Sequence, residues 1–409
     1  MSNYSKVQFI SWELYTGPFR VDERPRTGWY SGLLNPAEDK RLDALGQCWD
    51  IEARIAFTAD AIAKAWQKIE GDGKTPGKDK STLKVFMAPE FLYRGAGGAY
   101  LHDMIGGWAS GAPPEFQLPP PYNGPWAGLF DSLRALVADD KYQDWVFVFG
   151  TALSASFPTA KAAGGKYLLD PGAMGEIYNS ALIQRGGAAN RDSQYVSRKH
   201  YISPIDFVNQ LGAAIQHRPG NVVPFHPRAV IPADFLGATE GGAVFRLAGV
   251  NDGSGKPIDF GIEICLDHAQ SGNNANLFGR IRTAGQYVKL QLVPSGGLYL
   301  VEESIRLLPG GAATPHSYAF NCDGLGELGN GPRGSHTQVW NGANGVNPVP
   351  AANKLVEVNG GQLLAGTTLV AVADSVTTRG RQVEAEMLWN SGGTVKGAGQ
   401  VRVLTPLAL

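Results

Sequence analysis

The sequence has few cysteines, almost no net charge and no long apolar run, and each shortage excludes a class of protein. Three cysteines in 409 residues are too few for a disulfide-stabilised scaffold. A formal net charge of −1 gives no electrostatic support for binding nucleic acid or an anionic membrane. No stretch approaches the roughly 18 uninterrupted apolar residues of a membrane-spanning helix, and the start MSNYSKVQFI lacks a signal-peptide layout. We therefore expect a cytoplasmic protein that binds neither nucleic acid nor membrane.

Glycine and proline, by contrast, are abundant, with 53 and 26 copies. Because 43% of the residues are hydrophobic and 10% aromatic, this abundance indicates shaped loops in a globular protein rather than disorder. Two Gly- and Pro-rich insertions are expected near 95–125 and 203–242, and a β-rich tail from about 342. No repeat or internal boundary stands out, so we expect a single domain over 1–409. The aromatic residues Trp108 and Tyr122 of the first insertion suggest a lid over a pocket, or an oligomer contact.

The apolar pattern predicts short strands that alternate with helices. Helices are expected over 45–70, 126–138, 276–284 and 301–309. Strands are expected over 7–14, 83–87, 145–150, 177–185, 194–198, 243–250, 259–265, 288–293, 317–321, 338–340, 363–373 and 383–388. This alternation is typical of an α/β fold with two layers of each kind.

Glu90 is the first candidate for chemistry. It follows the strand expected over 83–87 and lies between Pro89 and the aromatic run FLY (91–93). Most glutamates at a strand end are simply solvated. An apolar setting would instead raise the pKa of Glu90 towards that of a general base. Tyr93, from the same run, is a candidate for lining a pocket.

Lys199 and Cys265 are the second and third candidates. Lys199 is either a surface lysine beside Arg198 or a cation at a strand end that lowers a thiol pKa and stabilises oxyanion charge. Cys265 is either a small apolar filler or a nucleophile where its strand turns polar. In the second case the N–H of Leu266 would help to form an oxyanion hole. Asp267 would orient this turn, if it is not simply exposed.

The ordered segments PEF (89–91), RKHY (198–201) and EICLDH (263–268) together resemble the carbon–nitrogen hydrolase (nitrilase) superfamily. The segments WVFVFG (145–150), YNSA (178–181) and QLVPS (291–295) look similar too, and the likeness spans about 7–341. The resemblance implies a four-layer αββα sandwich, commonly paired into a homodimer or larger assembly. It also implies a catalytic set in which Glu90 is the base, Lys199 stabilises the oxyanion and Cys265 is the nucleophile. His200 and Ser295 are then pocket candidates.

Departures from the family pattern bear on the substrate. True nitrilases usually carry Trp-Glu after the cysteine, whereas this chain has Leu266 and Asp267, which favours an amide or carbamoyl substrate. Many members also have a second glutamate in the site, for which Asp206 and Glu240 are weak candidates. The alternatives left open are a nitrilase, a thioester-forming acyltransferase and a non-catalytic scaffold.

Neither a cofactor nor a metal is expected. The segment GLGELG (324–329) spells a dinucleotide fingerprint, but Pro332 follows closely, so no helix can begin there to receive a pyrophosphate. His217 and His226 lie in a proline-rich insertion without a cysteine partner or helical spacing. The expected partners are a small amide-like molecule and further copies of the same chain.

Overall fold

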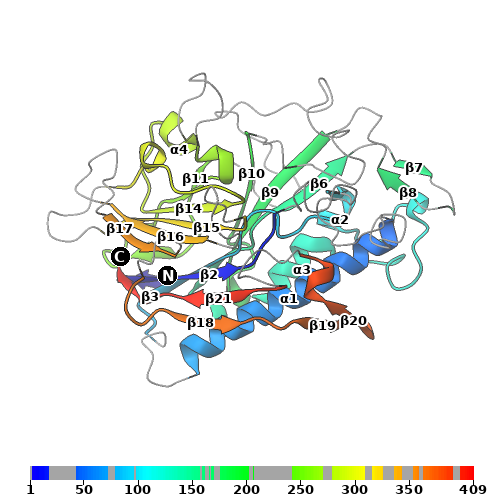
Figure 1. The fold of residues 1–409 in the computed structure, drawn as a ribbon, viewed down its shortest axis with the longest axis horizontal. Helices are drawn as coiled ribbons and strands as arrows, with labels where there is room; N and C mark the ends of the chain where they lie inside the picture. Colours follow the sequence, from blue (N-terminus) through cyan, green and yellow to red (C-terminus); the bar gives the residue numbers. More distant parts are fainter. Residues whose placement is uncertain are drawn as a thin grey trace.

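The protein is a mixed α/β fold in which sheets dominate, as a computed structural model shows (Figure 1). The structure describes residues 2–17, 43–71, 79–95, 98–156, 159–161, 165, 167–169, 176–201, 206, 242–269, 279–308, 316–325, 336–342, 353–358, 363–389 and 397–409. The α-helices within these ranges are α1 (Ala44–Glu70), α2 (Asp103–Gly106), α3 (Gly128–Leu136) and α4 (Arg280–Thr283). The expected α/β class is therefore confirmed at this coarse level.

The larger sheet has ten strands in the order β18-β21-β2-β3-β5-β9-β6-β4, with β10 paired to β9 and β22 paired to β2. Their bounds are β2 Lys6–Glu13, β3 Thr82–Met87, β4 Tyr100–Leu101, β5 Trp145–Val148, β6 Ala152–Ser156, β9 Glu176–Arg185, β10 Gln194–Arg198, β18 Thr368–Ala371, β21 Gln400–Val403 and β22 Leu407–Ala408. Strands β2, β3 and β5 run parallel, and β9 returns antiparallel to β5. The carboxyl ends of the three parallel strands therefore meet at one edge.

The second sheet has six strands in the order β11-β13-β14-β15-β16-β17. Their bounds are β11 Val244–Phe245, β13 Phe260–Ile262, β14 Leu290–Ser295, β15 Tyr318–Asp323, β16 His336–Asn341 and β17 Lys354–Glu357. Three two-stranded pairs complete the set: β1 (Ser2–Tyr4) with β12 (Val250–Asp252), β7 (Thr159–Lys161) with β8 (Tyr167–Leu169), and β19 (Ser375–Thr378) with β20 (Arg381–Glu384). Here β13, β14 and β15 are the parallel neighbours.

The two sheets pack face to face around a shared apolar core. Strands of both sheets contribute fully buried aliphatic and aromatic side chains to it. Phe9 of β2, for example, lies 4.8 Å from Phe320 of β15 between ring centroids. A polar contact also crosses the interface, because the hydroxyls of Ser11 and Thr337 lie 2.8 Å apart. Burying apolar surface stabilises a fold by about 25 cal/mol per Å², so these buried side chains hold the two sheets together.

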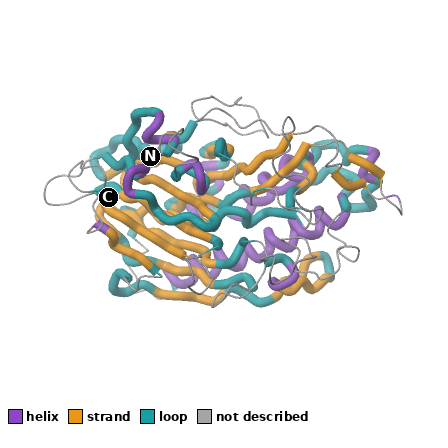
Figure 2. Tube along the Cα trace, turned by 45° about the horizontal axis from the view of Figure 1, so that its top comes forward, coloured by secondary structure: helices purple, strands orange, loops and turns teal. Residues whose placement is uncertain are grey.

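Helices cover the outer face of the larger sheet (Figure 2). The side chain of Asp43 caps α1 by accepting a hydrogen bond from the N–H of Gly46. Apolar residues of α1 and α3 then pack on this sheet. On the outer face of the second sheet, the described residues contain one short α-helix, the four-residue α4. The two sheets and one helical layer are thus visible, and the fourth layer of the expected sandwich is not established.

Most expected elements occur, with β10 matching its expected bounds, but two expectations were wrong. The helix over 301–309 is only a 3₁₀ turn (η9, Glu302–Ser304), after which the chain is extended. The N–H of Val288 donates to Arg306 O and the N–H of Leu308 donates to Val288 O, so sheet-like pairing replaces the helix. The strand over 383–388 ends at Glu384 and continues as the 3₁₀ helix η11 (Ala385–Met387).

Four further expected elements are shorter than the sequence suggested, and one of them is the strand over 363–373, which is reduced to β18. The strand over 243–250 is reduced to β11, the strand over 259–265 to β13, and the helix over 276–284 to α4, with 270–278 outside the described residues. Such short strands make few hydrogen bonds to their neighbours. Where they begin and end therefore depends more on side-chain packing than on the local sequence. The difference matters at 263–265, because leaving the strand early lets Cys265 turn out of the sheet.

The two aromatics of the first insertion, Trp108 and Tyr122, pack with the core on the helix side rather than beside Cys265. The ring N–H of Trp108 donates to the carbonyls of Tyr122 and Gly124, and the Tyr122 hydroxyl donates to Glu52 on α1 at 2.6 Å. Both rings pack with the core beneath the helices, whereas Cys265 belongs to the core between the sheets. The second insertion lies outside the described residues except for Asp206 and 242.

The two ends of the described chain lie side by side (Figure 1). Strand β22 pairs antiparallel with β2, so that Lys6 is opposite Ala408, and β21 pairs with the other half of β2. The β-rich tail is thus part of the larger sheet. Among the described residues no helix is both long and apolar enough to span a bilayer.

Candidate active site

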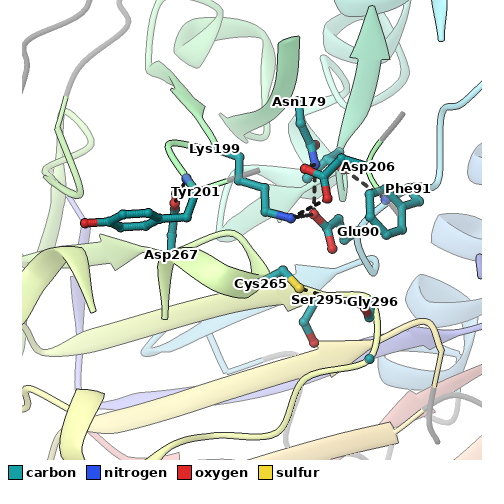
Figure 3. Close-up of polar contacts among 12 residues, drawn as sticks. Glu90, Phe91, Asn179, Lys199, Tyr201, Asp206, Cys265, Asp267, Ser295 and Gly296 are labelled. Atoms are coloured by element: carbon teal, nitrogen blue, oxygen red, sulfur yellow. Dashed lines mark hydrogen bonds and ion pairs between the residues drawn. The ribbon is translucent and has the colours of Figure 1, made fainter. Parts of the chain in front are cut away.

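Glu90, Lys199 and Cys265 come together at the carboxyl ends of their strands (Figure 3). Glu90 lies three residues beyond the end of β3, Lys199 directly follows β10, and Cys265 begins the 3₁₀ helix η8 (Cys265–Asp267) after β13. All three are buried, with Cys265 only 4% exposed. Ligands of open α/β sheets commonly bind at this edge. The three residues that the sequence analysis placed in one site therefore lie together in the structure.

The ammonium group of Lys199 lies between two carboxylates. Its Nζ is 2.9 Å from Oε1 of Glu90 and 2.7 Å from Oδ1 of Asp206, and all three side chains are fully buried. Removing one positive and two negative groups from water is costly, so such a cluster persists only with close mutual pairing. Asp206, a weak candidate on sequence alone, is thus a direct partner of Lys199. Glu240 lies outside the described residues.

Asn179 of β9 joins the same cluster. Its Nδ2 donates to Oε1 of Glu90 at 2.8 Å and, at the longer distance of 3.4 Å, to Oδ2 of Asp206. Its main-chain oxygen accepts a hydrogen bond from the N–H of Lys199 at 2.8 Å. Asn179 lies in the segment YNSA (178–181), in which no local pattern indicates a role for this residue. Only the pairing of β9 with β6 and β10 brings it here.

The second carboxylate oxygen of Glu90, Oε2, faces Cys265. It makes no hydrogen bond with the described residues, and the nearby Cys265 thiol is among the influences that lower the Glu90 pKa. A methyl group added at Gly296 would lie 3.2 Å from Oε2, and the Gly296 carbonyl lies 3.8 Å from Sγ of Cys265. The carboxylate therefore has one bonded oxygen and one oxygen turned towards the thiol.

Burial sets the protonation states of this cluster. It raises the pKa of Glu90 to about 7, against the lowering influence of Lys199. Burial also raises the pKa of the Cys265 thiol well above its usual value, and the negative charge of Glu90 adds to this. Burial alone would lower the pKa of Lys199, but Asp206 and Glu90 outweigh it, so that pKa is raised. The resting site therefore holds an ammonium, a neutral thiol and a carboxyl group that titrates near neutrality.

The backbone is strained at Cys265 and at the residue that follows Glu90. Cys265 has φ 49° and Phe91, next to Glu90, has φ 66°, both in the left-handed region that side chains with Cβ disfavour. Such residues persist where surrounding contacts enforce them, and they cluster at functional sites. At Phe91 the enforcing contacts include its N–H, which donates to Thr151 Oγ1 at 2.9 Å. At Cys265 the strain marks an abrupt turn from strand to 3₁₀ helix.

Buried arginines hold the turn that carries Glu90. Arg54 of α1 pairs with Asp50 at 2.7 Å, and its guanidinium donates to the carbonyls of Leu92 at 2.7 Å and Leu388 at 3.0 Å. It thereby ties α1, the turn after Glu90 and the C-terminal tail together. Arg94 stacks 3.6 Å from the centroid of the Phe91 ring and donates to the main-chain oxygen of Asp206 at 3.0 Å.

Asp267 and His200 belong to one structural contact. Oδ1 of Asp267 accepts hydrogen bonds from the N–H groups of His200 and Tyr201, each at 2.9 Å, and Oδ2 lies 3.3 Å from Arg280. Burial raises the pKa of Asp267 to about 6, while Arg280 lowers it. The carboxylate thus fixes the chain that follows Lys199. Asp267 is fully buried, so the alternative that it is simply exposed at the surface was wrong. Its contacts agree with the other expectation, that it orients the turn.

The other pocket candidates have mixed placements. Ser295 supports the Glu90 turn through its main-chain oxygen, which accepts the Glu90 N–H at 3.2 Å, while its hydroxyl contacts Asn321 at 2.8 Å. Leu266 lies in η8, directly after the cysteine. Tyr93 points elsewhere, because its hydroxyl lies 2.7 Å from Thr58 of α1 in the helix-side core. Tyr93 is thus not brought together with Cys265.

A buried network behind the cysteine was missed from the sequence. Glu263 accepts hydrogen bonds from the N–H of Ile281 at 2.8 Å and from Gln291 at 2.7 Å, and it lies 2.6 Å from Nδ1 of His268. Nε2 of His268 accepts the N–H of Val301 at 3.0 Å, so Nδ1 carries the proton that is donated to Glu263. This network anchors both ends of η8. No local signal in EICLDH distinguishes such anchoring from catalysis.

Comparison with known proteins adds little. No protein-family model and no curated protein matches the sequence. One solved structure that resembles the fold is a glutamate-to-glutamine mutant of the amidase from Nesterenkonia sp. AN1, which shows covalent addition of the acetamide moiety of fluoroacetamide at the active-site cysteine. The identity is 11%, the match covers 88% of each chain, and the TM-score is 0.34. A likeness at this level does not establish a shared family or activity.

Proposed function

We propose that this protein is a thiol hydrolase that cleaves a non-peptide C–N bond, in an amide or carbamoyl group of a small molecule. The observation that carries the proposal is the buried Lys199, bonded to Glu90 and Asp206 beside the strained Cys265. A base, a cation and a thiol in one water-poor place are what attack on an amide carbon requires. The nitrilase-like four-layer fold and the homo-oligomer implied by the sequence resemblance belong to the same proposal.

In the proposed reaction, Oε2 of Glu90 takes the thiol proton while Sγ of Cys265 forms a bond to the carbonyl carbon. Lys199 and the N–H of Leu266 stabilise the resulting oxyanion. Glu90 then gives the proton to the leaving nitrogen, and the C–N bond breaks. Ammonia or an amine departs, and a thioester to Cys265 remains. Water attacks the thioester with Glu90 again as base, the C–S bond breaks, and the proton returns to the thiol.

A general base is needed because the thiol is not ionised at rest. Burial raises the Cys265 pKa well above its usual value, so proton removal has to accompany attack. Asp206 fits the place of a second acidic group, since it shares Lys199 with Glu90 and keeps the ammonium charged. Among the described residues no group of three His, Cys, Asp or Glu side chains is arranged to hold a metal.

A substrate panel tests the proposal directly. Purified protein is offered simple amides, carbamoyl compounds and nitriles, and ammonia release is measured together with the mass of the chain during turnover. We expect ammonia from amides or carbamoyl compounds and an acyl adduct on Cys265. Ammonia from nitriles alone would favour a nitrilase, and an adduct resolved only by an added amine would favour an acyltransferase. No ammonia and no adduct with any compound would favour the scaffold.

The activity should rise with pH through about 7. Glu90 acts as a base only when ionised, and its pKa is about 7, so its active fraction grows as pH increases through that value. One unit below the pKa, only about a tenth of the sites would be competent. The measurement is kcat/KM against pH with a substrate that does not titrate in this range. A profile flat across neutrality would contradict the role given to Glu90.

A further inference from the structure

We propose that Asn179 is a positioning residue of this site, whose side-chain amide helps to hold one oxygen of the Glu90 carboxylate, Oε1, so that the other, Oε2, stays turned towards the Cys265 thiol. The inference rests on the proposed function, because it concerns how the base is aimed. Figure 3 shows Asn179 on the side of the cluster away from Cys265, with Lys199 and the two carboxylates between them.

The orientation of the Asn179 amide follows from its neighbours. Nδ2 lies 2.8 Å from Oε1 of Glu90 and 3.4 Å from Oδ2 of Asp206. Only the NH₂ end of the amide can face two carboxylates, since its oxygen would repel both. That oxygen is then left buried without a hydrogen-bond partner among the described residues. Burying an unsatisfied acceptor costs free energy, so the amide is held this way by what its NH₂ group does.

The amide does something that Lys199 alone cannot. An ammonium group is a compact point charge with rotatable donors, so on its own it does not fix the rotation of a carboxylate about the Cγ–Cδ bond. Here Nζ of Lys199 and Nδ2 of Asn179 both bond Oε1, at 2.9 and 2.8 Å. Two donors from different directions fix the plane of the carboxylate. Oε2 is then the oxygen without a strong donor, and it is the one near Gly296 and the thiol.

The main chain and side chain of Asn179 have separate tasks, which makes the inference testable. The main-chain oxygen accepts the Lys199 N–H at 2.8 Å, and the residue pairs with Leu153 across β9 and β6. A change of side chain leaves these bonds in place. Asn179→Leu keeps the shape of the side chain and removes the donor. Ser180→Ala is the matched control, because Ser180 is the next residue of β9, equally buried, and its hydroxyl bonds none of these groups.

The experiment is the rate of Cys265 alkylation by iodoacetamide as a function of pH, followed by peptide mass. Losing a donor to the ionised carboxylate should raise the Glu90 pKa, so Asn179→Leu should move the midpoint upward by roughly one pH unit. The plateau rate should fall roughly tenfold, because the base is no longer aimed. Ser180→Ala should keep the wild-type midpoint and plateau. Asn179→Ser, which also lacks the amide, serves in the same way if the leucine variant does not fold.

The outcomes separate this inference from the proposed function. Wild-type protein whose Cys265 reacts no faster than Cys48 and Cys322 would overturn the proposed function, and the inference with it. Wild-type protein with fast, pH-dependent alkylation, and Asn179 variants with the same midpoint and plateau, would overturn only the inference. A loss of thermal stability in the variants with an unchanged profile would mean that Asn179 merely separates two carboxylates, which also overturns it.

Discussion

Replacing Cys265 with alanine is expected to abolish turnover, lowering kcat by on the order of 10⁵-fold or more. The reason is that no other group in the cluster can form the covalent bond, and such catalytic units lose nearly all activity when one member is removed. The stability of the variant should change little, because the sulfur is replaced by a smaller apolar group. The measurement is ammonia release on the preferred substrate under single-turnover conditions.

The matched control is Cys48→Ala. Cys48 is equally a buried free cysteine, but it lies in the helix-side core with its sulfur 3.8 Å from that of Met104. That variant should retain wild-type turnover. More than trace activity in the Cys265 variant, or a comparable loss in the Cys48 variant, would refute the covalent mechanism.

Replacing Lys199 with methionine should cost both activity and stability. The ammonium is the cation shared by Glu90 and Asp206, and without it two carboxylates remain buried at close range. Removing one member of a buried ion cluster typically destabilises a protein by about 3–5 kcal/mol. Activity should fall by on the order of 10³-fold, since the charge opposite the oxyanion is lost. Denaturant unfolding and kcat/KM are the two measurements.

A double variant separates the two effects. Lys199→Met combined with Asp206→Asn removes one of the uncompensated negative charges, so much of the lost stability should return while the activity should not. The main-chain oxygen of Asp206 still accepts the hydrogen bond from Arg94 in this variant. Recovery of activity together with stability would mean that Lys199 is structural, and it would remove the cation from the mechanism.

The grouping of Glu90, Lys199 and Cys265 could be predicted because each lies in a short, ordered segment at the end of an apolar strand. The strands themselves were predictable for the same reason, as β10 shows, since strong β-forming residues bounded by polar ones mark a strand locally. Asp206 and Asn179 could not be assigned with the same argument. Their roles depend on the pairing of β9 and on a turn seven residues beyond Lys199, and neither is a property of a local pattern.

The failed expectations have physical causes of the same kind. A helix was expected within about 301–309, yet the main chain of this segment pairs with Val288, so tertiary pairing outweighs a weak local preference. Trp108 and Tyr122 looked like lid residues because glycines and aromatics surround them. Their polar atoms are instead taken up by neighbouring carbonyls and by Glu52 of α1. An aromatic-rich loop packs wherever its polar atoms can also be satisfied.

The position of the tail has a consequence for biosynthesis. Strand β2 finds its partner β21 nearly 400 residues later, and the Leu388 carbonyl helps to hold Arg54, which in turn holds the turn after Glu90. While the ribosome is still making the tail, one edge of β2 stays open to other chains. A nascent chain would therefore contain Cys265 well before the turn that follows Glu90 is held in place. Unfinished chains would need shielding from aggregation until the tail closes this edge.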